Sequence, residues 1–385
     1  MESRAHLISD EIPLPVEQAV LQVDVTREDS YRIHVVADVP DAIEALVAEL
    51  DGRRAAVITE NVVADLHADR IVSALAERDL LIGTTSMQAG EKSKSLTTAF
   101  ELIDWLAEVG FARRDVVVAL GGGVVVDTVG WVASAYMRGV PYVNVPTTLL
   151  AQVDAGIGGK VAVDHAEAKN LVGAFYQPRA VISCLAYLRT LDGRQVRAGL
   201  AEVVKKAVIA SPALFDFIEQ HVDDLVACAS PAVDVLVHAA GAIKTELVGR
   251  DPYEVDLRRP LNFGHTVGHA VETVTGYGPV LHGEAVAFGM AVAVDVARAR
   301  GLVVPSVADR VTALIRQLGL PVALSELGAQ PAVDDVLGAL TKIRQIRDGS
   351  LRFVLPMALG TTVIAEDVTE DEVRRALLRD RGDVR

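Results

Sequence analysis

Short apolar runs rich in β-branched residues recur through the first half of the chain and constrain its fold more than any other feature. From about Tyr31 to Leu191 these runs alternate with helical stretches. The runs are YRIHVVADV, RRAAVITENV, DVVVALGGG, PYVNVPTTLL and the segment around AVIS. Strands that are apolar on both faces and separated by helices are typical of a buried parallel sheet. Residues 1–190 are therefore predicted to form an open α/β domain.

The second half of the chain carries a helical pattern instead. Beyond Arg194, apolar residues recur at three- and four-residue spacing, which predicts amphipathic helices. The clearest windows are 212–229, 233–248 and 283–300. One segment, RFVLPMALGTTVIA at 352–365, predicts a late β-hairpin. Residues 191–385 are thus predicted to form an otherwise all-α domain that abuts the first domain across a cleft.

The composition excludes several classes of protein. The chain has 385 residues and is 51% apolar, enough to build the cores of two or three domains without disulfides. It carries 37 basic and 52 acidic residues, a net charge of −15. Such a chain repels phosphate backbones and anionic lipids, which disfavours generic binding to nucleic acids or membrane surfaces. Any anionic ligand must therefore meet a local cluster of cations.

Cysteine usage and the absence of targeting signals indicate a cytoplasmic protein. Cys184 and Cys228 lack C-x-x-C spacing and fit a reducing compartment. The opening segment MESRAHLISDEIPLPVEQ has acids and prolines where a signal peptide has a basic stretch and an apolar run. The most apolar segment, 116–126, is far shorter than the ~20 residues that span a bilayer.

A triple glycine, 121–123, follows the apolar strand VVVAL and precedes a helical stretch opened by Asp127. Glycines at such a turn let backbone N–H groups and a helix N-terminus approach a pyrophosphate. A tight strand-to-helix turn explains the glycines equally well, and GGGVVVD is not the G-x-G-x-x-G fingerprint. Hydroxyls at Thr147 and Thr148, after the strand PYVNVP, favour dinucleotide binding.

Two lysines accompany a glycine-rich segment that is predicted to be a loop. The segment runs from Asp154 through Gly-Gly to Lys160, and Lys169-Asn170 follows it. A close-wrapping loop that presents cations and an amide is suited to phosphate binding. Taken singly, either lysine is more simply a solvated surface residue.

The histidines give the strongest local signal. His265 and His269 are four residues apart and share one face of a helix, and His282 lies on the next element. With Glu202 in the run AGLAEVVKK, they suit a zinc site of two histidines and one carboxylate with open positions for substrate. The competing interpretation is that they are isolated core or capping histidines. His269 need not be a ligand, since it can donate to a substrate oxygen instead.

Further cations surround these elements. Lys205, Lys244, Arg258 and Arg259 lie near them in sequence, and Arg258 is four residues before Asn262. Arg258 is able to hold a carboxylate or phosphate bidentately. The pair Arg258-Arg259 is equally compatible with a solvated turn.

In combination, these segments resemble the dehydroquinate synthase superfamily of sugar phosphate cyclases. The resemblance rests on GGGVVVD, YMRGVPYVNVPTTLLAQVD, GGK, KNLVGAFYQPRAV, GLAEVVK, LNFGHTVGHAVE and LHGEAVAFGM, in that order from about Glu91 to Met290. It implies an N-terminal NAD-binding α/β domain and a C-terminal helical, metal-binding domain. Both agree with the patterns of the two halves.

The resemblance also implies a role for each site residue. Zinc or cobalt would be held by Glu202, His265 and His282. The NAD⁺ site would be lined by Asn61, Glu91, Lys94, Gly122, Gly123, Asp127, Thr147, Thr148 and Lys169. Substrate would contact Asp154, Lys160, Asn170, Lys205, Lys244, Arg258, Asn262 and His269. Arg138 would reach in from the partner subunit of a homodimer.

The chemistry implied by the resemblance is that of a phosphate-eliminating lyase. A ring hydroxyl is oxidised with NAD⁺, phosphate leaves by β-elimination, and the ketone is reduced again. Ring opening and an intramolecular aldol addition then close a carbocycle. Lys160, Asn170, Asn262 and His269 would hold the phosphate, while Lys205 would help to move protons.

The chain departs from the dehydroquinate synthase pattern at several pocket positions. These are Ala155-Gly156, Asp164, Ile343-Arg344-Gln345, Thr59 and Cys184. The Ala155-Gly156 pair is similar to sedoheptulose 7-phosphate cyclases, while HTVGH lacks the proline of the 2-epi-5-epi-valiolone type. The GGK segment disfavours the 2-deoxy-scyllo-inosose type. A sedoheptulose 7-phosphate cyclase of C7-cyclitol biosynthesis, making 2-epi-valiolone or an epimer, is therefore predicted.

Three alternatives stay open at this point. A 3-dehydroquinate synthase or its amino variant, using 3-deoxy-arabino-heptulosonate 7-phosphate, is favoured by Lys244 and Arg258, which match the pair that holds the substrate carboxylate. A metal-dependent polyol dehydrogenase shares the glycine turn but usually lacks the GGK, KN and HTVGH combination. A non-catalytic NAD-binding relative is disfavoured because all three candidate metal ligands are present.

Overall fold

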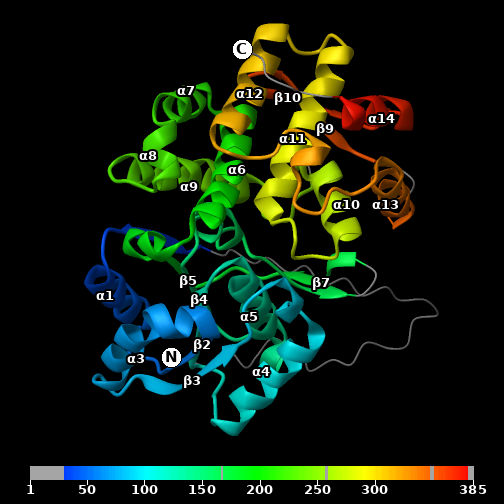
Figure 1. The fold of residues 1–385 in the computed structure, drawn as a ribbon. Coiled ribbons are helices and arrows are strands. Elements are labelled where there is room, and N and C mark those ends of the chain that lie inside the picture. Colours follow the sequence, from blue (N-terminus) through cyan, green and yellow to red (C-terminus); the bar gives the residue numbers. More distant parts are fainter. Residues whose placement is uncertain (1–29, 166–167, 256–258, 347–350, 380–385) are drawn as a thin grey trace, which may run out of the picture. The chain divides into compact units, whose positions relative to one another are not determined.

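The computed structural model describes residues 30–165, 168–255, 259–346 and 351–379. From Tyr31 onward, the described residues belong to one compact unit. In Figure 1 its strand-rich half lies below its helical half. No helix of the described residues is long and apolar enough to cross a membrane.

A six-stranded sheet forms the centre of the first half. Its spatial order is β1-β8-β5-β4-β2-β3, and every neighbouring pair is parallel. In that order the strands are Arg32–Val36, Ala180–Cys184, Tyr142–Pro146, Val116–Gly121, Ala55–Glu60 and Leu81–Met87. Five of them coincide with the predicted apolar runs. The sixth, β3, was not predicted, because an edge strand with the polar sequence LIGTTSM is only partly buried.

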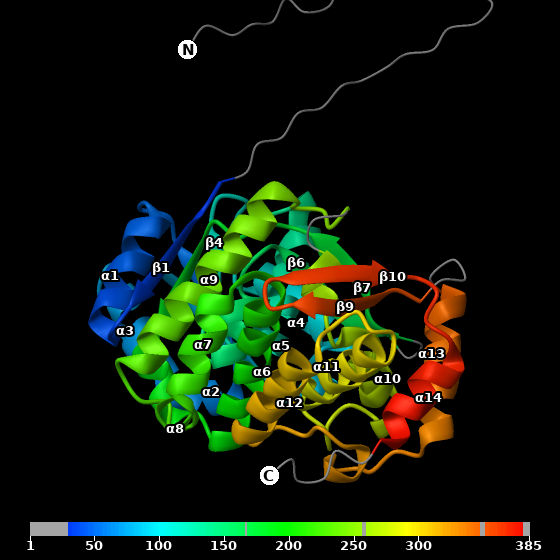
Figure 2. The same cartoon turned by 90° about the horizontal axis from the view of Figure 1, so that it is seen from above.

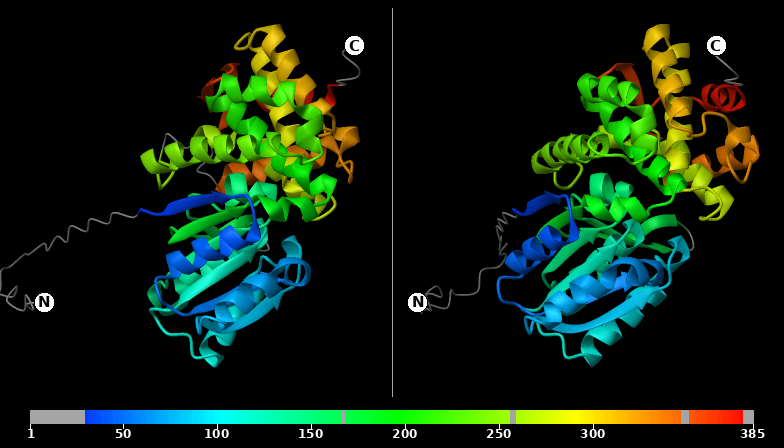
Figure 3. Two further views of the ribbon diagram at one scale, coloured as in Figure 1. Left: turned by 90° about the vertical axis from the view of Figure 1, so that its left-hand side faces the viewer. Right: turned by 60° about the vertical axis from the view of Figure 1, so that its left-hand side comes forward.

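Alternate residues of each central strand contribute to two different cores. In β4, Val116, Val118 and Leu120 join one core, whereas Val117 and Ala119 join the other. The first core is completed by α1 (Val39–Leu50) and α3 (Asp69–Ala76). The second is completed by α4 (Leu96–Glu108) and α5 (Gly123–Ala135). Figure 3 shows the sheet between these helices, as expected for a parallel sheet that is covered on both faces.

The two predicted phosphate lysines lie on strands rather than in a loop. Strands β6 (Lys160–His165) and β7 (Ala168–Phe175) pair as an antiparallel hairpin. Val161 and Val163 of β6 are buried in the same core as α5. The alternating sequence KVAVD therefore prevails over the neighbouring glycines, since it buries one face of the strand.

The described residues of the second half form helices and one hairpin. The first half also contains the short helix α2 (Asn61–Val63). The helices of the second half are α6 (Gly193–Ala210), α7 (Pro212–Gln220), α8 (Val222–Val226), α9 (Ala232–Arg250), α10 (His265–Thr275), α11 (His282–Ala299), α12 (Pro305–Gln317), α13 (Val333–Ile346) and α14 (Glu370–Leu378). The predicted hairpin is present as β9 (Phe353–Ala358) and β10 (Thr361–Ala365), which pair antiparallel. Figure 2 shows it beside α11. Strand β8 ends at Cys184 and α6 begins at Gly193, so the change from strands to long helices falls near residue 190. The domain boundary at that residue stays a prediction.

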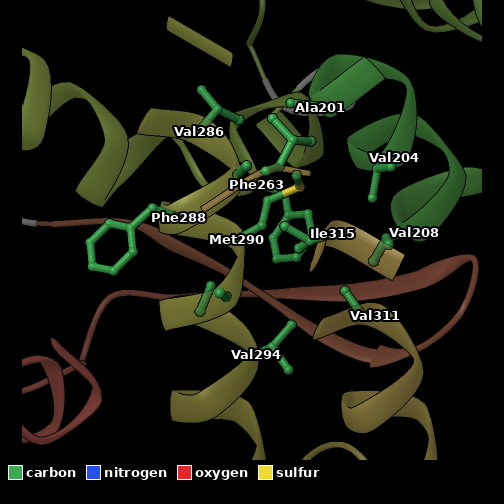
Figure 4. Packing of buried hydrophobic residues seen from close by; sticks show 14 of the residues in the cluster. Ala201, Val204, Val208, Phe263, Val286, Phe288, Met290, Val294, Val311 and Ile315 are labelled. Carbon is green, nitrogen blue, oxygen red and sulfur yellow. The ribbon is translucent and has the colours of Figure 1, made fainter. Parts of the chain in front are cut away.

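Helix α11 is the central element of the helical core. It is apolar on every side, and its residues from Ala285 to Val294 are buried without exception. Figure 4 shows Met290 and Val294 of α11 packed among side chains of α6 and α12, including Val204 and Ile315. Each fully buried aliphatic side chain of this kind contributes roughly 1.5–3 kcal/mol to stability. This core holds α11 in a fixed position relative to α6.

Two glycines of α11 allow neighbouring backbones to approach unusually closely. A Cβ atom on Gly283 would lie 2.0 Å from the carbonyl oxygen of Ala198 on α6. One on Gly289 would lie 1.9 Å from the carbonyl oxygen of Gly264, just before α10. Only glycine fits at such contacts. The close approach brings α6 and the first turns of α10 and α11 together.

Candidate active site

Three of the predicted metal-ligating side chains converge where α6, α10 and α11 meet. Glu202 lies in α6, and His265 and His282 are the first residues of α10 and α11. Their ligand atoms all lie within 4.8 Å of one another. Glu202 Oε1 is 3.7 Å from His265 Nε2 and 3.6 Å from His282 Nε2. The geometry therefore places the three groups around one point.

The hydrogen bonds of the two histidines leave both Nε2 atoms free to act as ligands. His265 Nδ1 donates to the carbonyl of Phe263 at 3.2 Å, and His282 Nδ1 donates to Glu272 at 3.1 Å. Burial, followed by the nearby Lys205, holds the pKa of His265 well below its usual range, so this ring is neutral. Lys205 contacts Oε2 of the buried Glu202, and Oε1 faces the two Nε2 atoms. A buried carboxylate oxygen that faces the Nε2 atoms of two histidines is a donor set that fits a divalent cation such as zinc.

A second cluster, formed by His269, Glu272 and His282, also has convergent ligand atoms. Its carboxylate is already engaged, because Lys169 Nζ donates to Glu272 Oε1 at 2.7 Å. Burial by itself would raise the pKa of Glu272, but His282 and Lys169 hold that pKa well below its usual range. Burial would likewise lower the pKa of His282, but the two glutamates raise it to about 9. His282 turns Nδ1 toward Glu272, whereas His265 and His282 both turn Nε2 toward Glu202 Oε1, which makes the cluster around Glu202 the better candidate for the metal.

Three lysines surround Asp154 beside the metal cluster. Lys205 Nζ lies 3.0 Å from Asp154 Oδ2, Lys206 Nζ lies 3.4 Å from it, and Lys244 contacts the other oxygen. Burial alone would raise the pKa of Asp154, but the three ammonium groups hold it well below its usual range. Lys205 also contacts Glu202, which joins the two clusters. The result is a buried cluster with more positive than negative groups, in a protein whose net charge is −15.

The structure places the predicted phosphate-binding residues in three locations. Lys160 and Asn262 come together, because both bind the carboxylate of Glu254, with Asn262 Nδ2 donating to its Oε1 at 2.7 Å. The His269 ring lies 5.2 Å from the His265 ring, at the metal cluster. Arg258 lies outside the described residues.

Asn170, which is predicted to bind substrate, lies against a residue that is predicted to bind NAD. Its side-chain oxygen accepts from Lys94 Nζ at 2.5 Å, and Lys94 also donates to Asp127 at 2.6 Å. Its backbone N–H donates to Asp164 at 2.7 Å. Burial raises the pKa of Asp127, although Lys94 opposes the shift. Asp164, one of the departures from the family pattern, therefore fixes the backbone next to Lys169.

The triple glycine forms the predicted strand-to-helix turn. Helix α5 begins at Gly123, with Gly122 as its N-cap and no side chain in the capping position, so Asp127 lies one turn inside the helix rather than opening it. A Cβ on Gly122 would lie 2.9 Å from Thr148 Cγ2. The buried hydroxyl of Thr147 has no hydrogen-bond partner. Uncapped N–H groups and a free hydroxyl around a glycine fit the pyrophosphate of a dinucleotide.

The remaining predicted residues occupy the edges of this region. Asn61 Oδ1 accepts from the backbone N–H of Ala89 at 2.8 Å. Glu91 lies 2.7 Å from Lys169 Nζ, and this lysine reaches the metal half through Glu272. Arg138 is exposed, with a φ of 65°. Among the departures, Thr59 and Cys184 are buried at the ends of β2 and β8, and Arg344 is exposed on α13.

Three residues of the site were missed in the sequence. Glu272 lies seven residues after His265 on the same helical face, so the spacing in the run HTVGHAVE already indicates that the two side chains are neighbours. Lys206 follows Lys205, and nothing local distinguishes the two lysines. Glu254 lies in an irregular segment with a φ of 55°, where no periodicity exists to place a side chain.

The chain matches known proteins in both sequence and fold. The family models described as 3-dehydroquinate synthase N-terminal and C-terminal match residues 84–198 and 199–342. The chain is 79% identical over 380 residues to 2-epi-valiolone synthase of Actinosynnema mirum, covering 98% of this chain and 100% of the relative.

Two solved structures share the fold over nearly the whole chain. One is ValA, a 2-epi-5-epi-valiolone synthase from Streptomyces hygroscopicus subsp. jinggangensis with NAD⁺ and Zn²⁺ bound, with 34% identity, a TM-score of 0.85 and coverage of 93% of this chain and 98% of ValA. The other is 2-deoxy-scyllo-inosose synthase with carbaglucose-6-phosphate, NAD⁺ and Co²⁺, with 25% identity, a TM-score of 0.79 and coverage of 90% and 95%.

Proposed function

The chain belongs to the 3-dehydroquinate synthase family, and we propose that it is an NAD- and metal-dependent sugar phosphate cyclase. The observation that carries the proposal is the contact between the two clusters of the site. Glu202 of the metal cluster touches Lys205 of the lysine cluster around Asp154. A sugar phosphate needs both kinds of group, because its hydroxyls suit a metal and its charge needs cations.

We propose sedoheptulose 7-phosphate as the substrate and 2-epi-valiolone, or a close epimer, as the product. This choice is supported by the identity of 79% to a 2-epi-valiolone synthase, which extends over 98% of the chain. The departures from the dehydroquinate synthase pattern fall at predicted pocket positions, as expected for a protein that binds a different substrate. A 3-dehydroquinate synthase activity is the second candidate, since Lys244, predicted to hold a substrate carboxylate, lies in the site on Asp154.

The cofactors and the side chains divide the chemistry between them. When bound, NAD⁺ supplies reversible hydride transfer and the divalent metal polarises a substrate oxygen. Lys205 is buried between Asp154 and Glu202, which hold its ammonium group in place for proton transfer. Lys160 and Asn262 bind the phosphate and release Glu254 when they do so. Phosphate leaves by β-elimination, and the carbocycle closes in an aldol addition.

Substrate preference tests the proposal directly. Purified protein with NAD⁺ and Zn²⁺ or Co²⁺ is offered sedoheptulose 7-phosphate or 3-deoxy-arabino-heptulosonate 7-phosphate, and phosphate release and the carbocyclic product are measured. We expect release from sedoheptulose 7-phosphate without net NADH. Turnover of the carboxylated sugar alone would establish the dehydroquinate synthase activity instead. Stoichiometric NADH accumulation would refute a cyclase altogether and indicate a polyol dehydrogenase.

A pair of histidine variants tests the metal assignment. His282→Ala removes a candidate ligand, and we expect it to abolish phosphate release with either sugar. His238→Ala is the matched control, because His238 is exposed on α9, away from the clusters described above. Full activity of the His282 variant would show that the metal lies elsewhere.

A cytoplasmic homodimer completes the proposal. Arg138 is exposed on the turn Tyr136–Arg138, beside the exposed Met137, as a residue that reaches into a neighbouring subunit would be. Sedimentation velocity should give a mass of twice the chain. A monomer that is fully active at the same concentration would exclude a catalytic role for Arg138 in the partner's site.

A further inference from the structure

We propose that Glu272 is a positioning residue that couples dinucleotide binding to metal binding. This inference rests on the proposed function, since it takes Lys169 as part of the NAD site and His282 as a metal ligand. Glu272 was assigned to neither site from the sequence. Its carboxylate nevertheless contacts a predicted residue of each site, Lys169 and His282.

On the metal side, Glu272 fixes the orientation of a ligand. Its Oε1 accepts from His282 Nδ1 at 3.1 Å, so His282 presents Nε2 to Glu202. Glu272 is only 3% exposed, and water therefore competes little for this bond. A carboxylate behind a metal-bound histidine sets its tautomer and ring orientation, and its loss typically weakens metal binding by about 10–100-fold.

On the dinucleotide side, the same oxygen binds a lysine of the other half of the molecule. Lys169 of β7 donates to Glu272 Oε1 at 2.7 Å, and it also lies 2.7 Å from Glu91. Lys169 is thus held between an acid of the α/β half and an acid of α10. Its ammonium group is enclosed by two carboxylates, which, against the opposing effect of burial, raise its pKa above the usual range.

The shared oxygen makes the two sites interdependent. Any movement of Lys169 that accompanies dinucleotide binding changes the contact on Glu272 Oε1, and the same atom determines how firmly His282 is held. The second oxygen, Oε2, is buried without a hydrogen-bond partner, so Glu272 has no alternative donor to turn to. NAD⁺ and the metal should therefore each strengthen the binding of the other by the same factor, as linkage requires. Factors of about 5–150 are typical of such coupling.

The test measures binding rather than turnover. The Zn²⁺ dissociation constant is determined by competition with a chromogenic chelator, with and without saturating NAD⁺, in the wild type, Glu272→Gln and Lys169→Met. In the wild type we expect NAD⁺ to tighten Zn²⁺ binding at least about fivefold. In Glu272→Gln, Zn²⁺ binding without NAD⁺ should weaken about 10–100-fold and the effect of NAD⁺ should disappear.

Lys169→Met separates the two halves of the inference. It leaves the contact between Glu272 and His282 in place, so Zn²⁺ affinity without NAD⁺ should stay close to the wild-type value while the effect of NAD⁺ is lost. Glu101→Gln, an exposed substitution on α4, is the control and should change nothing. If Glu272→Gln folds poorly, Lys169→Met still measures the coupling between NAD⁺ and Zn²⁺ binding, because it leaves the carboxylate of Glu272 beside the metal site in place.

Two results would overturn the inference while leaving the proposed function intact. One is unchanged Zn²⁺ affinity in Glu272→Gln, and the other is an undiminished effect of NAD⁺ in Lys169→Met. A wild-type protein that binds no NAD⁺ would refute the proposed function and the coupling together. The Zn²⁺ affinity of Glu272→Gln without NAD⁺ would then still decide whether Glu272 positions His282.

Discussion

Replacing Gly283 with alanine should separate two of the metal ligands. The new Cβ would lie 2.0 Å from the carbonyl oxygen of Ala198, whereas non-bonded atoms in ordinary packing stay roughly 3.5 Å apart. Helices α6 and α11 would therefore have to separate by about 1.5 Å. Ala198 lies one helical turn before Glu202, and Gly283 directly follows His282. Metal–ligand distances tolerate only about 0.2 Å, so the ligand geometry should be lost.

The assay separates stability from metal binding. Urea unfolding of the metal-free protein should show a loss of about 1–3 kcal/mol, the usual cost of overpacking a filled core. Chelator competition should show Zn²⁺ binding weakened at least about tenfold. Gly278→Ala is the matched control, since a Cβ there meets no atom within 4 Å and Gly278 does not need a left-handed φ. We expect that variant to bind Zn²⁺ as the wild type does.

Zn²⁺ binding by Gly283→Ala within about threefold of the wild type, a difference of under 1 kcal/mol, would refute this prediction. A variant that loses stability but keeps this affinity would show that the ligand spacing is not set by the contact between α6 and α11. A variant that keeps both would show that the helices adjust without strain.

Three further substitutions test the charges of the site and the surface. Burial lowers the pKa of Lys206 from 10.5 to about 8, so its ammonium destabilises the folded metal-free protein below pH 8 and less as the pH rises toward 10.5. Lys206→Met should therefore raise the free energy of unfolding at pH 7 by about 1–3 kcal/mol, and this gain in stability should shrink by pH 10. A lower free energy of unfolding at pH 7 would contradict this prediction. Glu254→Gln removes the anion held by Lys160 and Asn262. Inorganic phosphate should then inhibit turnover at least about tenfold more strongly than in the wild type. Unchanged inhibition would show that Glu254 is not part of the phosphate site. The hydrogen bond from Arg300 lowers the pKa of Glu372 from 4.5 to about 2, which stabilises the fold above pH 4.5 and is lost as the pH falls toward 2. Arg300→Met should make the free energy of unfolding depend less on pH between 4.5 and 2. An unchanged pH dependence in this range would show that the pair of Arg300 and Glu372 contributes nothing to stability there.

Local patterns predicted most of the elements, because each buried strand or helix must hide a periodic set of apolar residues. The parallel strands and the helices around α9 and α11 were identified in this way. The pattern failed at β3 and at the hairpin of β6 and β7, where strands are partly exposed and glycines or polar residues obscure the alternation.

The candidate site was predictable only as a set of residue types. The spacing of His265 and His269 placed both on one face of a helix, and the resemblance to a family supplied the rest of the set. The sequence did not reveal that Asn170 lies against Lys94, or that Lys206 and Glu254 belong to the site. These contacts join segments far apart in the chain, so no local period contains them.

The sequence by itself determined which elements form, how the charges are distributed along the chain, and which side chains are able to bind a metal or a phosphate. Those properties depend on residue type and short-range spacing. Only the tertiary structure decided that Glu202, His265 and His282 face one another and that one oxygen of Glu272 serves both Lys169 and His282. The physical reason is the packing of the helices: contacts such as Gly283 against Ala198 set the distance between α6 and α11, and that distance determines where the ligands meet.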